Sequence, residues 1–169
     1  MKASLSWLKQ YVSMEMEIDR LVEALTMVGL EVDTVTNRYD FLDTVVIGRI
    51  ADIQAHPKAD KLKLCEVDIG NRRMSVVCGA PNIETGQHVP VALPGTIFPD
   101  TTVLQKSVIR GIESEGMICS EKELGLGPDA GGVMVLDPRS AIGTKLHAAL
   151  NLMDPIIEIA RKKGVAVLE

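Results

Sequence analysis

The sequence predicts an α+β protein in which a five-stranded antiparallel β-barrel is inserted into a small, discontinuous α/β lobe. Three observations support this fold class. Short Val- and Ile-rich runs follow one another from residue 45 to residue 109, separated by Gly and Pro turns. No long helical pattern lies between these runs, which favours a small barrel. Helical periodicity is confined to the first 30 residues, and short apolar runs return near the C-terminus.

The first 35 residues predict two helices and one strand. Ser4 can cap a short helix that extends to about Val12. A second helix begins near Ile18, where apolar residues repeat at helical spacing, and Gly29 is well placed to end it. Residues 30–35 then alternate between apolar and mainly acidic side chains, which predicts a half-buried edge strand.

The barrel strands are predicted from runs that are rich in β-branched residues and bounded by turn residues. The four main candidates are Val45–Ile53, Leu62–Ile69, Met74–Cys78 and His88–Leu93. Two later runs, Val103–Ile109 and Val133–Leu136, add one or two more strands.

The N-terminal lobe needs a partner segment, because two helices and one strand cannot bury both of their faces. We expect the C-terminal runs Ile156–Ile159 and Val165–Leu168 to supply it by returning beside the first strand. The lobe therefore comprises residues 1–38 plus 152–169, and the barrel comprises residues 42–150. One short helix within residues 142–152 leads out of the barrel.

Composition limits how the protein could bind a polyanion. The net charge is −5, and residues 44–127 carry nine basic and ten acidic side chains, so their own net charge is −1. Binding of RNA would therefore depend on a local basic patch. Phe98 is the single aromatic residue in that range, too few rings to hold a single strand by stacking, so RNA would be recognised by backbone and shape.

The sequence contains no pattern typical of a membrane span, a metal site or a catalytic centre. It has no run of 18 apolar residues, and its first residues lack an unbroken apolar core, so we expect a cytoplasmic protein. The three cysteines, Cys65, Cys78 and Cys119, are predicted to be reduced, and those at 65 and 78 to be buried in strands. The histidines are scattered, and no phosphate loop or nucleophile–base pair is evident, so no metal and no catalytic residue is expected.

Three motifs in order along the barrel resemble the tRNA-binding domain of the oligonucleotide-binding (OB) fold class. They are His56-Pro-x-Ala-Asp-Lys-Leu62, Val77-Cys-Gly-Ala-Pro-Asn82 and Arg110-Gly-x-x-Ser-Glu-Gly-Met117 with Ser120. The leader Ser6-Trp-Leu-x-x-Tyr-Val12, followed by Leu25-Thr-Met-x-Gly-Leu-Glu-Val32, is similar to the first residues of the bacterial phenylalanyl-tRNA synthetase beta subunit. The resemblance extends from Met1 to about Ile159; in that family the chain continues, so this sequence is expected to be a fragment or a shortened relative.

The resemblance implies a non-catalytic module that assists tRNA binding in phenylalanyl-tRNA aminoacylation. It also implies partners: tRNA, the synthetase alpha subunit and a second beta subunit. The whole enzyme of this family uses ATP, Mg²⁺ and phenylalanine, and none of these is expected to bind this chain. Two alternatives remain open, namely a free-standing dimeric tRNA-binding cofactor and a structural module with little affinity for RNA.

Basic residues near two turns are the candidate RNA-binding residues. Lys58, Lys61 and Lys63 surround the turn between the first two barrel strands, where they could meet phosphates or be merely solvated. His56, Pro57 and Asp60 are expected to shape this turn. Arg110 could bind phosphate, although an ion pair with Glu113 or Glu115 is the favoured expectation. The resemblance adds four residues to the RNA-facing surface: Ser114, Glu115, Gly116 and Met117.

Overall fold

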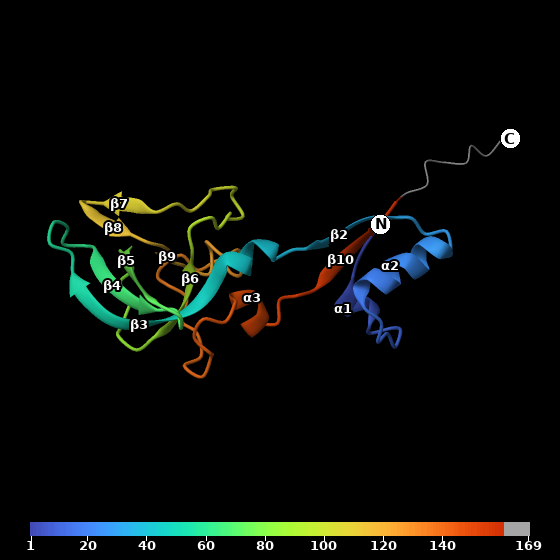
Figure 1. The fold of residues 1–169 in the computed structure, drawn as a ribbon, viewed down its shortest axis with the longest axis horizontal. Coiled ribbons are helices and arrows are strands. Elements are labelled where there is room, and N and C mark those ends of the chain that lie inside the picture. The colour runs from blue at the N-terminus through green and yellow to red at the C-terminus, as the bar shows by residue number, and fades with distance from the viewer. Residues whose placement is uncertain (161–169) are drawn as a thin grey trace. The chain divides into compact units, whose positions relative to one another are not determined.

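The computed structural model describes residues 1–160. The chain divides into two compact units, each of which is described by itself (Figure 1). The first unit consists of Met1–Asp40 together with the segment that begins at Met153, and the barrel unit consists of Phe41–Leu152.

The barrel unit is a five-stranded, antiparallel, nearly closed barrel of the OB type, so the predicted fold class is confirmed. The strand order is β5-β4-β3-β6-β9. The four main predicted strands are all present, and the five strands of the sheet are β3 (Val45–Ala55), β4 (Lys63–Asp68), β5 (Arg73–Cys78), β6 (His88–Ala92) and β9 (Met117–Ile118).

The prediction of the fifth strand was wrong. That strand is the two-residue β9, which pairs with β6 through Val91 and Ile118, and neither of the two later apolar runs takes its place. Of Val103–Ile109, only the end forms β7 (Ser107–Ile109), which pairs with β8 (Ile112–Ser114) in a separate hairpin. The run Val133–Leu136 forms no strand and contributes a single bridge between Leu136 and His88.

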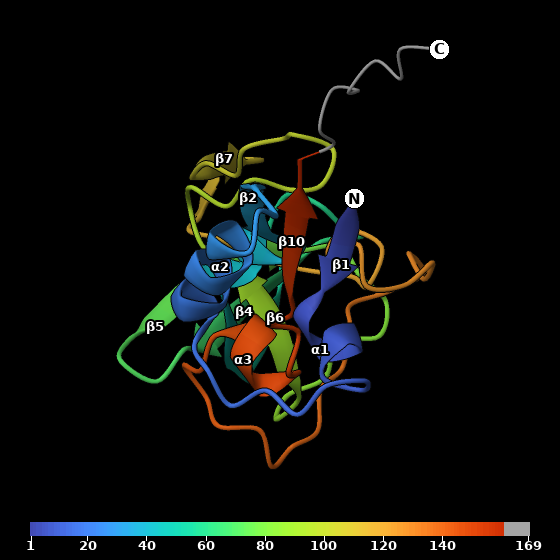
Figure 2. The same ribbon diagram turned by 90° about the vertical axis from the view of Figure 1, so that its right-hand side faces the viewer.

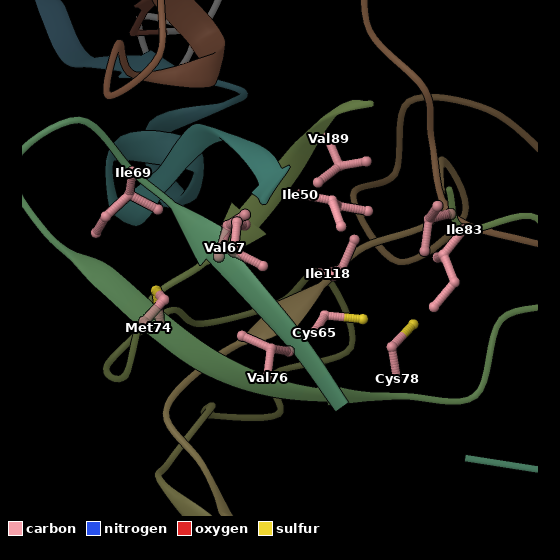
Figure 3. Packing of buried hydrophobic residues seen from close by; sticks show 12 residues of the cluster. Ile50, Cys65, Val67, Ile69, Met74, Val76, Cys78, Ile83, Val89 and Ile118 are labelled. Carbon is pink, nitrogen blue, oxygen red and sulfur yellow. The ribbon is translucent and has the colours of Figure 1, made fainter. Parts of the chain in front are cut away.

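The core of the barrel is made mainly by inward-facing residues of its strands, with Ile69, Ile83 and Val133 added from the connections between them (Figure 3). Burial alternates along β4 and β5, as expected for strands with one face on the core. All three cysteines are free, as predicted, and the expected burial of Cys65 and Cys78 is confirmed; Cys119 is buried as well. Burial raises the pKa of Cys65 to about 11 and that of Cys119 to about 12, so both remain neutral thiols that pack as small apolar groups.

The two ends of the inserted barrel unit are tied together by Asp43. This residue lies in η1 (Asp40–Thr44), and its carboxylate accepts hydrogen bonds from Lys145 and, at 3.2 Å, from Nε2 of His147. His147 belongs to α3 (Leu146–Ala149), the short helix expected at the end of the barrel. The hydrogen bonds from Lys145 and His147 lower the pKa of Asp43 from its ordinary value.

The first unit is a three-stranded antiparallel sheet with two helices (Figure 2). The central strand is β10 (Pro155–Ile159), which pairs with β1 (Lys2–Ser4) on one side and with β2 (Val32–Asn37) on the other. The expected return of Ile156–Ile159 beside the first predicted strand is therefore confirmed, whereas Val165–Leu168 lies outside the described residues.

Both predicted N-terminal helices are present, although the first is shorter than expected. It is α1 (Leu5–Leu8), and the hydroxyl of its predicted cap, Ser4, accepts a hydrogen bond from the amide of Trp7 at 3.2 Å. The second is α2 (Ile18–Met27), which is followed at Gly29 by a positive φ of 88°. Within residues 1–160, no helix is long and apolar enough to cross a membrane.

Candidate nucleic-acid interface

The turn between β3 and β4, residues 56–62, is held mainly by its own backbone. The amide of His56 donates to the carbonyl of Leu62 at 3.1 Å, and the amide of Leu62 donates to the carbonyl of Ala59 at 3.0 Å. Among the described residues, the side chain of Asp60 makes no hydrogen bond, so it does not shape the turn as expected. The shape of the turn thus depends on the backbone and on His56.

His56 connects this turn to the β7–β8 hairpin. Its side chain is only 5% exposed. The ring Nδ1 accepts a hydrogen bond from the amide of Lys58 at 3.1 Å, so the proton of the neutral ring resides on Nε2. Nε2 in turn donates to the carbonyl of Ile109 at 3.2 Å. One buried imidazole therefore joins two loops that are separated by more than 50 residues in the sequence.

The turn of the hairpin presents Arg110 to solvent. Arg110 and Gly111 have φ angles of 51° and 90°, the signature of a two-residue type I′ turn, in which glycine avoids the strain of a positive φ. Lys58 lies against the same turn, because a Cβ built on Gly111 would be 3.4 Å from its Nζ. We call residues 56–62 together with 109–112 the tip of the barrel; in Figure 1 the two turns lie side by side.

The expected ion pair of Arg110 is wrong. Glu113 pairs with Lys106 at 3.4 Å, and Glu115 pairs with Arg72 at 3.1 Å. Within residues 1–160, no carboxylate pairs with Arg110, and both nearby glutamates are paired with other cations. Arg110 is therefore available to an external anion.

The three candidate lysines differ in their surroundings. Lys58 and Lys61 are exposed, and neither forms an ion pair in the described part of the chain. Lys63 is half-buried in β4, directly opposite Cys78 in the sheet register, and its charge acts on the pKa of both Cys65 and Cys78. The structure thus brings Lys58 and Arg110 together at the tip and leaves Lys63 at the wall of the barrel.

The residues 114–117 close the barrel. Ser114, 3% exposed, donates its hydroxyl proton to the carbonyl of Gly116 at 2.9 Å and accepts the amide of Val77 at 3.1 Å. Gly116 is buried where a Cβ would lie 2.7 Å from the carbonyl oxygen of Ala92. These contacts hold the segment between β5 and β6, and contact of Ser114 or Gly116 with RNA stays a prediction.

Glu115 and Met117 complete this segment with half-buried side chains. The carboxylate of Glu115 accepts the amide of Ser75 at 3.1 Å, and its own amide donates to the carbonyl of Ser75 at 2.9 Å. The hydrogen bond from Ser75 and the nearby Arg72 hold the pKa of the Glu115 carboxyl below its ordinary value. Met117 forms the start of β9. Both residues stay predicted members of the RNA-facing surface.

The barrel offers no aromatic platform to a nucleobase. Phe98, the one aromatic residue in 44–127, is 8% exposed and contributes to the core. Stacking of bases on exposed rings is the usual means by which open barrels hold single strands. The exposed charged groups of the tip are three cations, Lys58, Lys61 and Arg110, and one carboxylate, Asp60. The cations can contact phosphates without reading bases.

Sequence reasoning assigned His56 only to its own turn and missed its bond to Ile109. No local signal could have revealed this contact, because the hairpin lies in the connection between β6 and β9, far from His56 in the sequence. In OB-folds, the loop between the first and second strands and the loop between the fourth and fifth strands are the ones that bind oligonucleotides. The tip is built from these two loops.

Comparisons with known proteins are consistent with this geometry. A family model described as a putative tRNA-binding domain matches residues 45–145. The chain is 44% identical over 161 residues to the phenylalanine–tRNA ligase beta subunit of Nitratidesulfovibrio vulgaris, and 45% identical over 159 residues to that of Syntrophus aciditrophicus. These alignments cover 95% and 94% of this chain but 20% of each relative, so the chain spans about a fifth of their length.

Among solved structures, a methionyl-tRNA synthetase-related protein from Pyrococcus horikoshii matches with a TM-score of 0.46 and 16% identity. The match covers 60% of this chain and 87% of that one. A similarity this remote adds nothing to the assignment.

Proposed function

Because the chain belongs to the family of putative tRNA-binding domains, we propose that it is a non-catalytic tRNA-binding module that assists phenylalanyl-tRNA aminoacylation. The observation that carries the proposal is the tip: two exposed cations, Lys58 and Arg110, stand free of ion pairs on the two loops that bind oligonucleotides in OB-folds. Lys61 adds a third exposed cation beside them, and Lys63 a half-buried one.

Binding at such a site is expected to be weak and insensitive to sequence. Lysine and arginine reach phosphate oxygens as donors, and the described barrel surface holds no exposed ring to stack on a base. We therefore propose recognition of the folded tRNA by its backbone, with little dependence on the identity of the anticodon.

The wider context follows from the similarity to ligase beta subunits, of which this chain spans about a fifth. We propose that it acts in the cytoplasm within an assembly that contains a synthetase alpha subunit and a second beta subunit. ATP, Mg²⁺ and phenylalanine would be bound by other parts of that assembly, so this chain is proposed to need no cofactor.

Titration of fluorescently labelled tRNA with the chain at low salt tests the proposal. Saturable binding that weakens as salt is added is the expected result. Light scattering on the same sample addresses the alternative of a dimeric cofactor, which requires a tight dimer. If tRNA does not bind even at low salt, the chain is a structural module and the proposal fails.

The proposed lack of catalytic activity is tested by a separate assay. ATP–pyrophosphate exchange with phenylalanine should stay at background with this chain alone. Exchange above background would contradict the non-catalytic assignment.

A further inference from the structure

Among the side chains of residues 1–160, the imidazole of His56 is the one that bonds to both turns of the tip. Each of its ring nitrogens is satisfied, Nδ1 by the amide of Lys58 and Nε2 by the carbonyl of Ile109. A buried ring with both nitrogens paired carries no desolvation penalty from an unmet hydrogen bond. It therefore acts as a rigid link between the two loops.

The two bonds fall next to the two cations. Nδ1 binds the backbone of Lys58 itself, and Nε2 binds the carbonyl of the residue that directly precedes Arg110. The same ring thus fixes the backbone at Lys58 and next to Arg110, from which the two cationic side chains extend. The ammonium of Lys58 then lies over the hairpin turn, 3.4 Å from a Cβ built on Gly111.

The turn of the hairpin needs such a link, because the hairpin is not part of the barrel sheet and its bond to β5 lies at the other end of β8, at Ser114. Strands β7 and β8 pair with each other in a separate two-stranded sheet, within the long connection from β6 to β9. A loop that is not held would have to be ordered when RNA binds, and that ordering weakens affinity. A loop that is already ordered before RNA binds presents its cation without this loss of affinity.

We propose that His56 is a positioning residue for RNA binding, which holds Lys58 and Arg110 together as one site for backbone phosphates. This inference rests on the proposed tRNA-binding function and assigns the part of the surface that carries it. The site requires the pair: Lys58 supplies a point charge, and Arg110 supplies a planar group that can bind phosphate through two donors.

Two substitutions separate the two bonds of the ring. His56→Asn places an oxygen near the position of Nδ1, so it can keep the bond to Lys58 but cannot reach Ile109. His56→Gln places an amide N–H near the position of Nε2, so it can keep the bond to Ile109. His56→Phe fills a similar space and forms neither hydrogen bond. It is used in place of His56→Asn if the Asn variant does not fold. His88→Gln, which alters another buried ring in β6, is the matched control.

The test is a set of double-mutant cycles read as tRNA dissociation constants at fixed low salt. Lys58→Ala, Arg110→Ala and the double variant are measured in the parent, in His56→Gln, in His56→Asn and in the His88→Gln control. In the parent and the control, the fold-change in dissociation constant caused by the double variant should differ from the product of the two single fold-changes by about fivefold or more. His56→Gln should keep this coupling, and in His56→Asn the effects should multiply to within about twofold.

Thermal unfolding of each variant establishes that the comparison is made between folded proteins. Equal coupling in the parent and in His56→Asn, or no coupling in the parent, would overturn the role of His56 while leaving tRNA binding intact. A parent that does not bind tRNA at all would overturn the proposed function and this inference with it.

Discussion

The hydroxyl of Ser114 and the amide of Val77 are joined by a hydrogen bond of 3.1 Å, which ties β8 to β5 across the nearly closed side of the barrel. The same hydroxyl donates to the carbonyl of Gly116 at 2.9 Å. Ser114 thus satisfies a backbone donor and a backbone acceptor at once, inside the protein.

Replacing Ser114 by alanine should destabilise the barrel, and an affinity for tRNA that stays unchanged would contradict the predicted contact of Ser114 with RNA. The change removes hydrogen bonds from the amide of the half-buried Val77 and from the carbonyl of the buried Gly116, which costs about 1–3 kcal/mol. Urea denaturation measures this loss, and tRNA titration below the unfolding transition measures affinity. A marked loss of affinity in the folded variant would show instead that the hydroxyl touches RNA.

Gly116→Ala should destabilise the protein by steric conflict. The added methyl group would lie 2.7 Å from the carbonyl oxygen of Ala92 and equally close to the end of Met74, and overpacking of this kind costs about 1–3 kcal/mol. Gly131→Ala is the control, since its nearest neighbour is an exposed carboxylate at 3.3 Å. Equal stability of the two variants in urea would contradict the close packing of Gly116.

Glu115 should make stability dependent on pH under acid conditions. The pKa of its carboxyl is held below the ordinary 4.5 by the amide of Ser75 and by Arg72, so the unfolded chain takes up the proton first as the pH falls. The stabilisation is complete above pH 4.5 and is lost as the pH drops through the lowered value. Glu115→Gln should therefore flatten the acid limb of a plot of stability against pH; an unchanged limb would mean that the carboxylate contributes nothing.

Much of the fold follows from local patterns, and the errors have physical causes. Strands such as β3 and β4 were predicted because long runs of β-branched residues end at clear turns. The composition of residues 114–117 indicates a tight turn that leads into a strand, but its place as the fifth strand was not predicted. The strand β9 has only two residues, and its place in the sheet is set by tertiary pairing with Val91. Apolar residues alone made the run at 133–136 look like a better candidate.

The candidate site was predictable only in part, for similar reasons. The cluster of lysines around one turn is visible in the sequence, as is the Arg-Gly pair that suits a type I′ turn. That Glu113 and Glu115 are taken by Lys106 and Arg72 depends on which strands become neighbours. Spacing along the chain favoured the wrong partner for Arg110, which forms no ion pair within the described residues.

Removal of the residues after Asn151 should loosen the first unit and leave the barrel folded. The truncation deletes β10, the central strand, and with it Ile157, which is 1% exposed. Strands β1 and β2 then have no partner between them, and the loss of buried aliphatic side chains at about 1.5–3 kcal/mol each exceeds what so small a unit can spare. Amide exchange in residues 4–35 should become fast, and unchanged protection there would contradict the role of β10.

The salt dependence of tRNA binding tests the central claim most directly. Each neutralised phosphate contributes roughly 0.7–0.9 to the slope of log affinity against log salt, so a patch of three or four contacts predicts a slope of about −2 to −4. Replacing Lys58, Lys61, Lys63 and Arg110 together by alanine should bring the slope close to zero and weaken all tRNAs alike. The control with Lys9→Ala and Arg20→Ala, two exposed basic residues of the first unit, should keep the slope of the parent. A fourfold variant that binds tRNA as tightly as the parent, with the same slope, would contradict the account.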